Sequence, residues 1–599
     1  MTGTAISETA SAPTGAENVE WDLRELGLEN GEIGLRAQLE RVRQDAADFA
    51  ARFKGRLGEL DAVELKDVLH EVEELIARTR RYQAGAYLNY CMDTSAPSRS
   101  QLMHFAHEVA ADAGTQLGFL IEEWRQIDGQ RRQQLLEDPR LEPYRVLLEL
   151  ALASADHRLS DAEERILFEK SLTGIVAWRR LYTHLVSEIR VTVRDRDISL
   201  EEAFGLLEQQ EASLRSDAAA GISRALLQGV STRALVVNNV VLDGEIDARL
   251  RGYSNWMTPS NIANQVPDDA GHSLIEAVVA RYDIAQRYYR LKARLMGLER
   301  ISFDADRLAP ISTEADAEGI PWANAKAIIL GAYAAFSPAL RTAAEDFFEK
   351  RWIDARPSPH KVPHAFTTAV PGAHPYILLT YNGSLRSLLT LAHELGQGVQ
   401  AALSAKQGAL PHSSLVMSET ASLFSERIVF SHLIAAEPAP LRRRELKMIL
   451  LDSVMNMVFR HVAITRFEEA VRSERRSRGE LSAEDISKLW VDAHHEMLGD
   501  AVALPQQFGT WWSCVPHLVD SPGHEQLHSM SSLLAQALHR RCLEEPESAE
   551  GVVELLMRGG ATSPQQLVHP FGIDLGAPDS WRRELDALDS LITEAEPSG

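Results

Sequence analysis

Apolar residues recur every three or four positions along most of the chain, which is the spacing of one face of an α-helix. From residue 21 to residue 301 this pattern predicts one helix after another, with few strand signals. Helical spacing returns from Ser384 to the C-terminus and breaks around residues 504–522. The clearest stretch, 61–80, carries its apolar residues among charged ones: Val63, Leu65, Val68, Leu69, Val72, Leu75 and Ile76. The pattern predicts a mainly α-helical protein.

Local signals predict where several helices begin and end. Ser160 followed by Glu163 resembles a capping box, so we expect a helix to begin there. The stretch 283–296 has helical composition and should end near Gly297. Pro321 precedes Trp322 where another helix is expected to open, because proline is tolerated in a first turn.

One short stretch favours a strand. Residues 356–372 contain four prolines and predict loops with a small sheet. The run 376–381 is the best strand candidate, closed by Asn382 and Gly383. An exposed edge of this strand would pair with an extended peptide.

Composition narrows the class of protein. The 599 residues are 45% hydrophobic and 25% charged, as in soluble globular proteins, and no run of about 18 apolar residues predicts a membrane span. The net charge of −24 disfavours binding to nucleic acid. Three cysteines are too few for a disulfide framework, so a reducing cytoplasm is expected. Residues 1–16 are rich in small and polar residues and are expected to form a disordered tail rather than a secretion signal.

The stretch 388–400 carries the strongest chemical signal. The motif His-Glu-x-x-His places two imidazoles on one helix face, where both can hold zinc, while the glutamate activates a metal-bound water. His393 and Glu394 stand in the first two positions of this motif. Gln397 occupies the position of the second histidine. The sequence therefore predicts a metallopeptidase helix with one altered ligand.

Motifs spread over almost the whole chain resemble the oligoendopeptidase F branch of the thimet-oligopeptidase family. They are Trp21-Asp22-Leu23, Trp352-Ile353-Asp354, His364-Ala365-Phe366, Pro375-Tyr376-Ile377-Leu378, Ala392-His393-Glu394-Leu395-Gly396 and Ser418-Glu419-Thr420-Ala421-Ser422. The resemblance implies a two-lobed, helical, zincin-like fold, with a small β-sheet beside the metal helix and a deep central channel. It suggests an N-terminal lobe at 17–310, a catalytic lobe at 311–599 and a metal helix at 384–404.

The resemblance also assigns roles to single residues. His393 matches the first zinc ligand, Glu394 the general base and Glu419 a further ligand, whose carboxylate suits zinc. Gln397 offers a neutral amide oxygen that can ligate a metal but prefers harder ions than zinc. We therefore expect one divalent metal, with zinc favoured and iron or manganese as alternatives, and a weakened affinity for zinc.

A second departure lies downstream. His517 matches a family histidine that binds the developing oxyanion. His524, Gln526 and His528 stand where the family has tyrosines, so hydroxyl donors are lost and two imidazoles are gained. His524 and His528 would share a helix face. They either replace the missing ligand, or form a new acid–base pair, or are partly exposed histidines of a degenerate site.

Three functional hypotheses follow from these departures. The first is a working oligopeptidase that acts on short peptides. The second is a metalloenzyme of this fold that performs other chemistry on a peptide-like or amino-acid-derived substrate. The third is an inactive protein that encloses a peptide. Retention of Glu394, Glu419 and His517 favours the first hypothesis.

Overall fold

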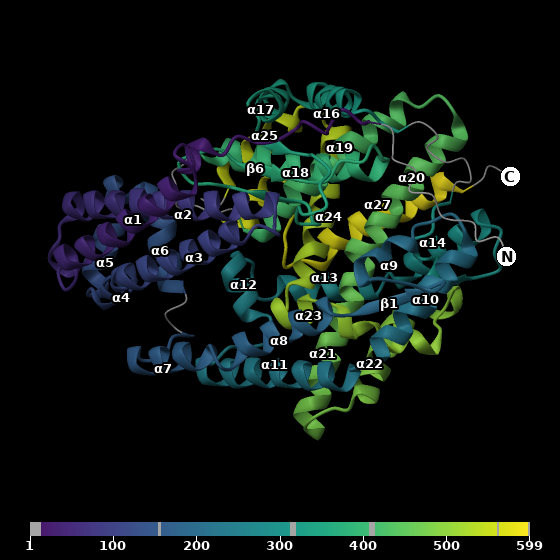
Figure 1. Ribbon diagram of the computed structural model, residues 1–599, viewed down its shortest axis with the longest axis horizontal. Coiled ribbons are helices and arrows are strands. Elements are labelled where there is room, and N and C mark those ends of the chain that lie inside the picture. Colours follow the sequence, from purple (N-terminus) through teal and green to yellow (C-terminus); the bar gives the residue numbers. More distant parts are fainter. Residues whose placement is uncertain (1–12, 154–156, 312–318, 406–413, 560–561, 597–599) are drawn as a thin grey trace. The chain divides into compact units, whose positions relative to one another are not determined.

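The computed structural model describes residues 13–153, 157–311, 319–405, 414–559 and 562–596. Helices make up most of these residues, and the strands form three small sheets (Figure 1). The mainly α-helical class predicted from the spacing of apolar residues is therefore confirmed.

The chain divides into two compact units, each built from separated segments. Unit 1 comprises Met1–Ala155, Asp316–Leu433 and Leu538–Thr562. Unit 2 comprises Asp156–Ala315, Ile434–Ala537 and Ser563–Gly599. Both units draw on segments from either side of residue 310. The compact units thus differ from the predicted lobes 17–310 and 311–599, and that lobe boundary stays a prediction.

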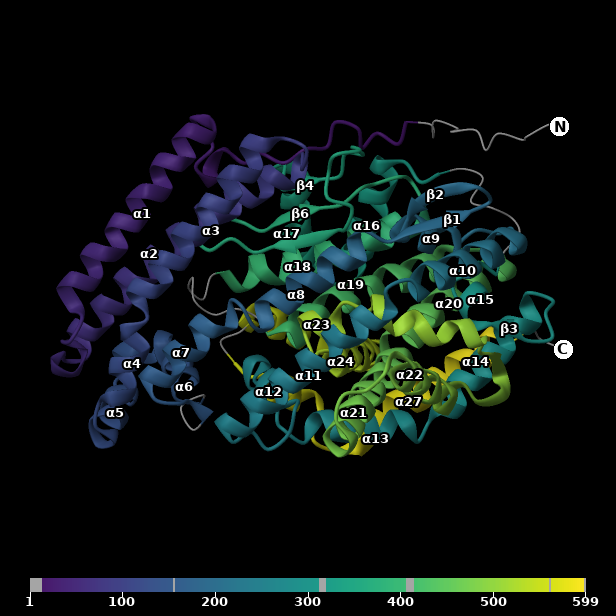
Figure 2. The same ribbon diagram turned by 60° about the horizontal axis from the view of Figure 1, so that its bottom comes forward.

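In unit 1, the helices α1 (Gly31–Phe53), α2 (Ala62–Met92) and α3 (Pro97–Leu117) pack against one another (Figure 2). Asp61 caps α2, since its carboxylate accepts hydrogen bonds from the first-turn N–H groups of Val63 and Glu64. The apolar residues predicted to form the buried face of α2 do so, except that Ile76 is partly buried and Val63 is 44% exposed in the first turn. The buried ones are Leu65, Val68, Leu69, Val72 and Leu75.

The other helices of unit 1 are α4 (Phe119–Gln126), α5 (Gly129–Leu136), α6 (Arg145–Ala153), α16 (Trp322–Phe336), α17 (Pro338–Glu349), α18 (Leu385–Ser404) and α25 (Ser548–Arg558). Helices α19 (Leu415–Ala436) and α24 (Glu525–Glu544) contribute residues to both units. The helix expected after Pro321 is α16, with Pro321 at its N-cap.

The sheet of unit 1 precedes α18 in the chain. Its strands are β4 (Ile353–Asp354), β5 (Phe366–Thr368) and β6 (Tyr376–Leu378), in the order β4-β6-β5. β6 is fully buried, parallel to β4 and antiparallel to β5. The prediction of a strand within 376–381 is confirmed, but the prediction that its edge is exposed is wrong, because both edges of β6 are hydrogen-bonded to other strands.

The first residues of the described chain are anchored. The N–H of Trp322, at the start of α16, donates to the carbonyl of Thr14 at 2.8 Å, and Ala16 is fully buried. The first N–H groups of a helix have no acceptor within the helix, so the carbonyl of Thr14 can accept from one of them. The predicted disordered tail 1–16 is therefore wrong for residues 13–16, and residues 1–12 lie outside the described part of the chain.

Unit 2 is also mainly helical. Its helices are α7 (Asp161–Ser171), α8 (Ile175–Ser187), α9 (Leu200–Leu206), α10 (Ala212–Leu227), α11 (Val230–Arg251), α12 (Thr258–Asn264), α13 (Ala270–Val279), α14 (Tyr282–Leu295), α15 (Phe303–Asp306), α20 (Pro440–Val454), α21 (His461–Arg478), α22 (Ala483–Leu498), α23 (His517–Asp520), α26 (Pro564–Val568) and α27 (Pro578–Ala595). Its strands are β1 (Arg190–Val193) paired with β2 (Arg196–Ser199), and β3 (Ile301–Ser302) paired with β7 (Val502–Ala503).

Two predicted helix boundaries in unit 2 are confirmed. Ser160 and Glu163 form the capping box of α7, and α14 ends at Leu295, two residues before Gly297. The break expected around residues 504–522 contains the 3₁₀ segment Gln506–Cys514 and the short helix α23.

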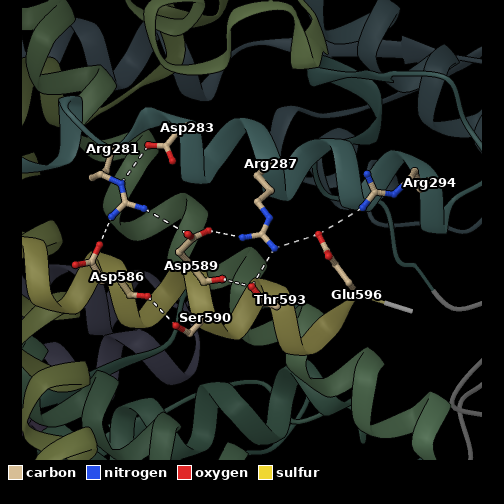
Figure 3. Close-up of polar contacts among 9 residues, drawn as sticks. All are labelled: Arg281, Asp283, Arg287, Arg294, Asp586, Asp589, Ser590, Thr593 and Glu596. Carbon is tan, nitrogen blue, oxygen red and sulfur yellow. Dashed lines mark hydrogen bonds and ion pairs between the residues drawn. The ribbon is translucent and has the colours of Figure 1, made fainter. Parts of the chain in front are cut away.

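Ion pairs join α14 to the C-terminal helix α27 (Figure 3). Arg281 pairs with Asp586 and lies 3.5 Å from Asp589, while Arg287 pairs with Asp589 at 2.7 Å and with Glu596 at 3.2 Å. Such partly exposed pairs contribute about 0–1 kcal/mol each, so they orient α27 more than they stabilise it. Buried apolar residues of α27, among them Leu585 and Leu588, supply its packing.

One continuous helical stretch of unit 2, Pro440–Arg478, is long and apolar enough to cross a membrane by length and composition, with a mean hydropathy of 1.3 over 18 residues. The bent pair α10 and α11 passes the same test when its two helices are taken together. Since 56% of the window in Pro440–Arg478 is buried within the protein, it has the character of a core helix. The absence of a membrane span stays a prediction.

Candidate functional site

Helix α18 carries the predicted metal motif. The hydroxyl of Ser384 caps the helix by accepting a hydrogen bond from the N–H of Ser387 at 3.1 Å. The predicted metal helix, 384–404, matches α18 with Ser384 as its cap. Leu388, Leu391 and Leu395 are buried, whereas His393 is only partly buried. The apolar face therefore fixes the rotation of α18 and leaves the imidazole accessible.

Gly396 allows α18 to lie very close to α19. A Cβ atom at Gly396 would come within 2.6 Å of the Ala421 carbonyl oxygen and 2.9 Å of the Ser422 Cα. The hydroxyl of Ser425, also on α19, donates to the carbonyl of Ala392 at 2.6 Å. The approach places the motif of α18 beside the residues of α19 that the sequence singled out.

His393 and Glu419 converge across this contact. The Nε2 atom of His393 lies 3.8 Å from an Oε atom of Glu419. The Nδ1 atom of the same ring lies 2.6 Å from Oε1 of Glu426, one further carboxylate on α19. A metal-ligating histidine characteristically donates its other N–H to a carboxylate, which fixes the ring and directs the free nitrogen at the ion. Glu426 orients His393 in this way toward Glu419.

Glu394 lies on the inner side of the same helix turn and is only 6% exposed. The hydroxyl of Thr367, on β5, lies 2.8 Å from both Oε2 and the carbonyl oxygen of Glu394. Burial raises the pKa of Glu394, and the charge of His393 and the hydroxyl of Thr367 only partly oppose this rise. A base with a raised pKa can accept a proton and release it again near neutral pH.

The charges around His393 are strongly unbalanced. Burial disfavours the imidazolium ion, but the hydrogen bond and charge of Glu426, with the charges of Glu419 and Glu394, prevail and raise the pKa of His393 to about 9. Three carboxylates thus surround one imidazole. A divalent cation suits such a surplus of negative oxygen donors beside an imidazole nitrogen.

Gln397 follows His393 by four residues and lies on the same side of α18, partly buried. Within the described part of the chain, no group of three His, Cys, Asp or Glu residues is arranged to hold a metal ion. At position 397 an amide stands where the motif has its second imidazole. His393 and Glu419 fit a metal as two donors, and the assignment of Gln397 as the third donor stays a prediction.

The downstream histidines belong to unit 2, and their position relative to α18 stays a prediction. His517 opens α23, and its Nδ1 lies 3.0 Å from Oε1 of Glu525. The ring of His528, in the first turns of α24, stacks on that of His517 with centroids 5.8 Å apart. His461 completes the cluster, 3.5 Å from Glu525 and 5.5 Å from the His528 ring. The structure therefore brings His517 and His528 together.

His524 has a different environment. It precedes the first residue of α24, so the expected helix face shared with His528 does not extend to it. Its Nδ1 lies 3.1 Å from the carbonyl oxygen of Ser521, within its own turn. The ring is thus engaged in closing the turn that leads into α24.

Glu525 controls the charges of this histidine cluster. Burial alone would raise its pKa, but the hydrogen bond from His517 and the neighbouring positive charges lower it to about 2. The same hydrogen bond raises the pKa of His517, whereas burial lowers that of His461 to about 3. The hydrogen bond to Glu525 therefore favours the protonated form of His517, whereas burial favours the neutral form of His461.

Sequence reasoning missed four of these residues: Thr367, Glu426, His461 and Glu525. Glu426 follows Glu419 by seven residues, two helix turns on the same face, so its position was available from spacing. Thr367 and His461 come from distant parts of the chain, and nothing in their local sequence points to the site.

Comparisons with known proteins agree with this architecture. Residues 334–587 match the model of peptidase family M3, and residues 123–190 match that of oligopeptidase F. Oligopeptidase PepF of Bacillus subtilis is 22% identical over 92% of this chain and 84% of its own length. Group B oligopeptidase PepB of Streptococcus agalactiae is 22% identical over 97% of both chains.

Solved structures share the fold. A putative peptidase from Chlamydophila abortus superposes with a TM-score of 0.79 at 18% identity, over 97% of this chain and all of the other. Oligoendopeptidase-F from Enterococcus faecium gives a TM-score of 0.70 at 20% identity, over 94% of this chain and 97% of the other. Two family models, relatives aligned over nearly their whole length and a shared fold lead to one conclusion: the chain belongs to peptidase family M3, in its oligopeptidase F branch.

Proposed function

We propose that the chain is a metal-dependent oligopeptidase that hydrolyses short peptides. The observation that carries the proposal is the 3.8 Å approach of His393 Nε2 to Glu419, with Glu426 holding the opposite ring nitrogen and Glu394 on the same helix turn. His393, Gln397 and Glu419 would hold the metal. In this family the metal is a divalent ion, usually zinc, and when bound it supplies Lewis-acid chemistry at the scissile carbonyl.

The residues of the chain supply the remaining steps. The carboxylate of Glu394 accepts a proton from the attacking water and passes it to the leaving amine, a transfer favoured by its raised pKa. The imidazole of His517, whose hydrogen bond to Glu525 raises its pKa and favours the protonated form, would be a donor for the developing oxyanion. His528 stands where the family has a tyrosine, so an imidazole replaces a phenol at this position. His524 lies in the turn that leads into α24.

The histidine cluster of unit 2 favours one second candidate, a metalloenzyme of this fold with other chemistry on a peptide-like substrate. The rings of His461 and His517 each contact the ring of His528. Such a cluster supplies proton donors and acceptors that a set of phenols does not. The third hypothesis, an inactive peptide-binding protein, rests on the missing third His, Cys, Asp or Glu donor among the described residues.

The cellular setting is part of the proposal. The three cysteines are free thiols, and Cys91 and Cys542 are buried. Free thiols suit a reducing compartment, so we place the enzyme in the cytoplasm, where it would act on short peptides rather than on nucleic acid.

Metal analysis and a quenched-fluorescent peptide library test these hypotheses together. We expect the wild-type protein to bind one divalent ion and to cleave peptides. Glu394→Gln should keep the metal and lose cleavage by at least about 100-fold, since one general base contributes 10²–10⁴-fold. Glu108→Gln, on the exposed face of α3, is the matched control and should leave both unchanged.

The other outcomes separate the hypotheses. A bound metal without cleavage of any library peptide would favour the second candidate. Failure to bind zinc, iron or manganese would leave only the peptide-binding protein.

A further inference from the structure

A cavity of about 190 Å³ lies within unit 2, and all of its lining residues belong to that unit. Its walls come from the segment after α15, the end of the π-helical turn Met455–Arg460, α22, the 3₁₀ segment Gln506–Cys514 and the residues before α24. Its lining residues include Arg307, Arg460, Trp490, Phe508, Trp511 and His517. We call this space the Arg307–Arg460 cavity.

Two arginines in the wall share a single protein acceptor. The Nη1 atoms of Arg307 and Arg460 lie 3.5 and 3.4 Å from the same Oδ1 atom of Asn456. Both residues are partly buried. Throughout the described residues, no carboxylate lies within 4 Å of either guanidinium. Buried guanidinium groups are normally paired, because each has five N–H donors to satisfy.

The two acidic residues whose charges raise the pKa values of these arginines are hydrogen-bonded to other groups. The charge of Asp452 raises the pKa of Arg307. Its carboxylate accepts hydrogen bonds from Lys292 at 2.9 Å and from Tyr288. The charge of Glu525 raises the pKa of Arg460, and its carboxylate is hydrogen-bonded to His517. The cavity therefore retains an excess of positive charge.

Both guanidinium groups stay protonated near neutral pH. Burial and the charge of Arg460 lower the pKa of Arg307 to about 10, and burial lowers the pKa of Arg460. Burial is the largest cause of both shifts and outweighs the neighbouring negative charges that oppose it. An anion bound between them would remove that penalty.

We propose that the Arg307–Arg460 cavity binds a carboxylate group, held by the two guanidinium groups together with Asn456. Arginine presents paired N–H groups that match the two oxygens of a carboxylate. Trp490, Phe508 and Trp511 line the same space and would cover the apolar part of the bound molecule. The volume suits a group of the size of one amino-acid residue rather than a whole oligopeptide.

The source of the carboxylate follows from the neighbouring residue. His517, the proposed oxyanion donor, lines the same cavity. On the basis of the proposed function, the carboxylate is the free C-terminus of a short peptide whose scissile carbonyl lies at His517. The cavity would then make the enzyme selective for peptides that end within one or two residues of the cleaved bond.

Isothermal titration calorimetry tests this inference on the full chain in the Glu394→Gln background, which cannot hydrolyse the probe. The probes are acetyl-alanyl-alanine, its C-terminal amide and inorganic phosphate. We expect the free acid to bind at least about tenfold more tightly than the amide. Arg307→Gln and Arg460→Gln should each remove that preference. Arg460→Lys should reduce it, because lysine keeps the positive charge but lacks the paired N–H groups of a guanidinium.

Arg249→Gln is the matched control. Arg249 is exposed on α11 of the same unit, and this substitution changes the net charge by the same amount. It should leave the preference for the acid intact. Equal binding of acid and amide, no binding of any probe, or tighter binding of phosphate than of the acid would each overturn the inference. The comparison of acid with amide uses unsubstituted arginines, so it stands even when a variant folds poorly.

Failure of the inference is distinguishable from failure of the proposed function. A protein that cleaves no peptide but prefers the acid keeps the carboxylate site and loses the peptidase assignment. A protein that cleaves peptides without any preference for the acid loses the carboxylate site alone.

Discussion

Replacement of Gly396 by alanine tests the contact on which the candidate metal site depends. The new Cβ would lie 2.6 Å from the Ala421 carbonyl oxygen, whereas ordinary contacts of this kind begin at 3.4 Å. The atoms it meets belong largely to the backbone of α19, so no side-chain rotation relieves the clash. Helices α18 and α19 must separate by about 0.8 Å at this point.

Two consequences of that separation can be measured. Overpacking of this kind costs about 1–3 kcal/mol, so we expect a corresponding loss in the free energy of unfolding. His393 lies on α18 while Glu419 and Glu426 lie on α19, so both of their contacts should lengthen and the affinity for a divalent metal should fall. Urea denaturation measures the first effect and calorimetric zinc titration measures the second.

Gly114→Ala provides the matched control in unit 1. Gly114 lies inside α3, and an added Cβ there would meet no atom within 4 Å. Because alanine favours a helix interior over glycine, this variant should gain about 0.5–1 kcal/mol. A Gly396→Ala protein with wild-type stability and wild-type zinc affinity would refute the proposed role of the α18–α19 contact.

Three further changes test other parts of the structure. Gln397→His should tighten zinc binding, measured by competition with a chelating dye, because it restores an imidazole donor; unchanged affinity would show that position 397 does not reach the metal. Glu426→Gln should weaken zinc binding by about 10–100-fold, because it removes the carboxylate that orients His393, and equal affinity in both proteins would contradict that role. His494 is fully buried, and burial lowers its pKa to about 3. The unfolded chain takes up this proton near pH 6.5 and the folded chain does not, so stability should fall by about 1.4 kcal/mol per pH unit as the pH drops from 6.5 toward 3. In urea denaturation at pH 7 and pH 5, His494→Phe should lose this contribution while the exposed control His495→Gln keeps it; equal acid sensitivity of the two variants would exclude a neutral His494.

Local signals in the sequence were sufficient for many of the elements. Helix boundaries at Ser160, Leu295 and Pro321 follow from capping chemistry and from the conformational limits of proline, which act within a few residues. The strand at 376–378 was predictable from its apolar run. Its central place in the sheet was not, because the partners that cover its edges are set by tertiary pairing.

The candidate site shows the same division. His393, Glu394 and Glu419 could be singled out from motif spacing, and the structure brings His393 and Glu419 together. The cluster of His517, Glu525 and His528 also includes His461, which no local pattern places beside them. His524 was expected on the helix with His528, but the helix begins one residue later.

The sequence by itself determined the helical class, the position of the metal motif and its altered residue at 397, because periodicity and motif spacing are properties of neighbouring positions. Tertiary structure alone decided the close contact of α18 with α19, the orientation of His393 by Glu426 and the meeting of Arg307 with Arg460 at Asn456. These depend on side chains brought together from distant segments by packing of the core, and no local pattern encodes such distances.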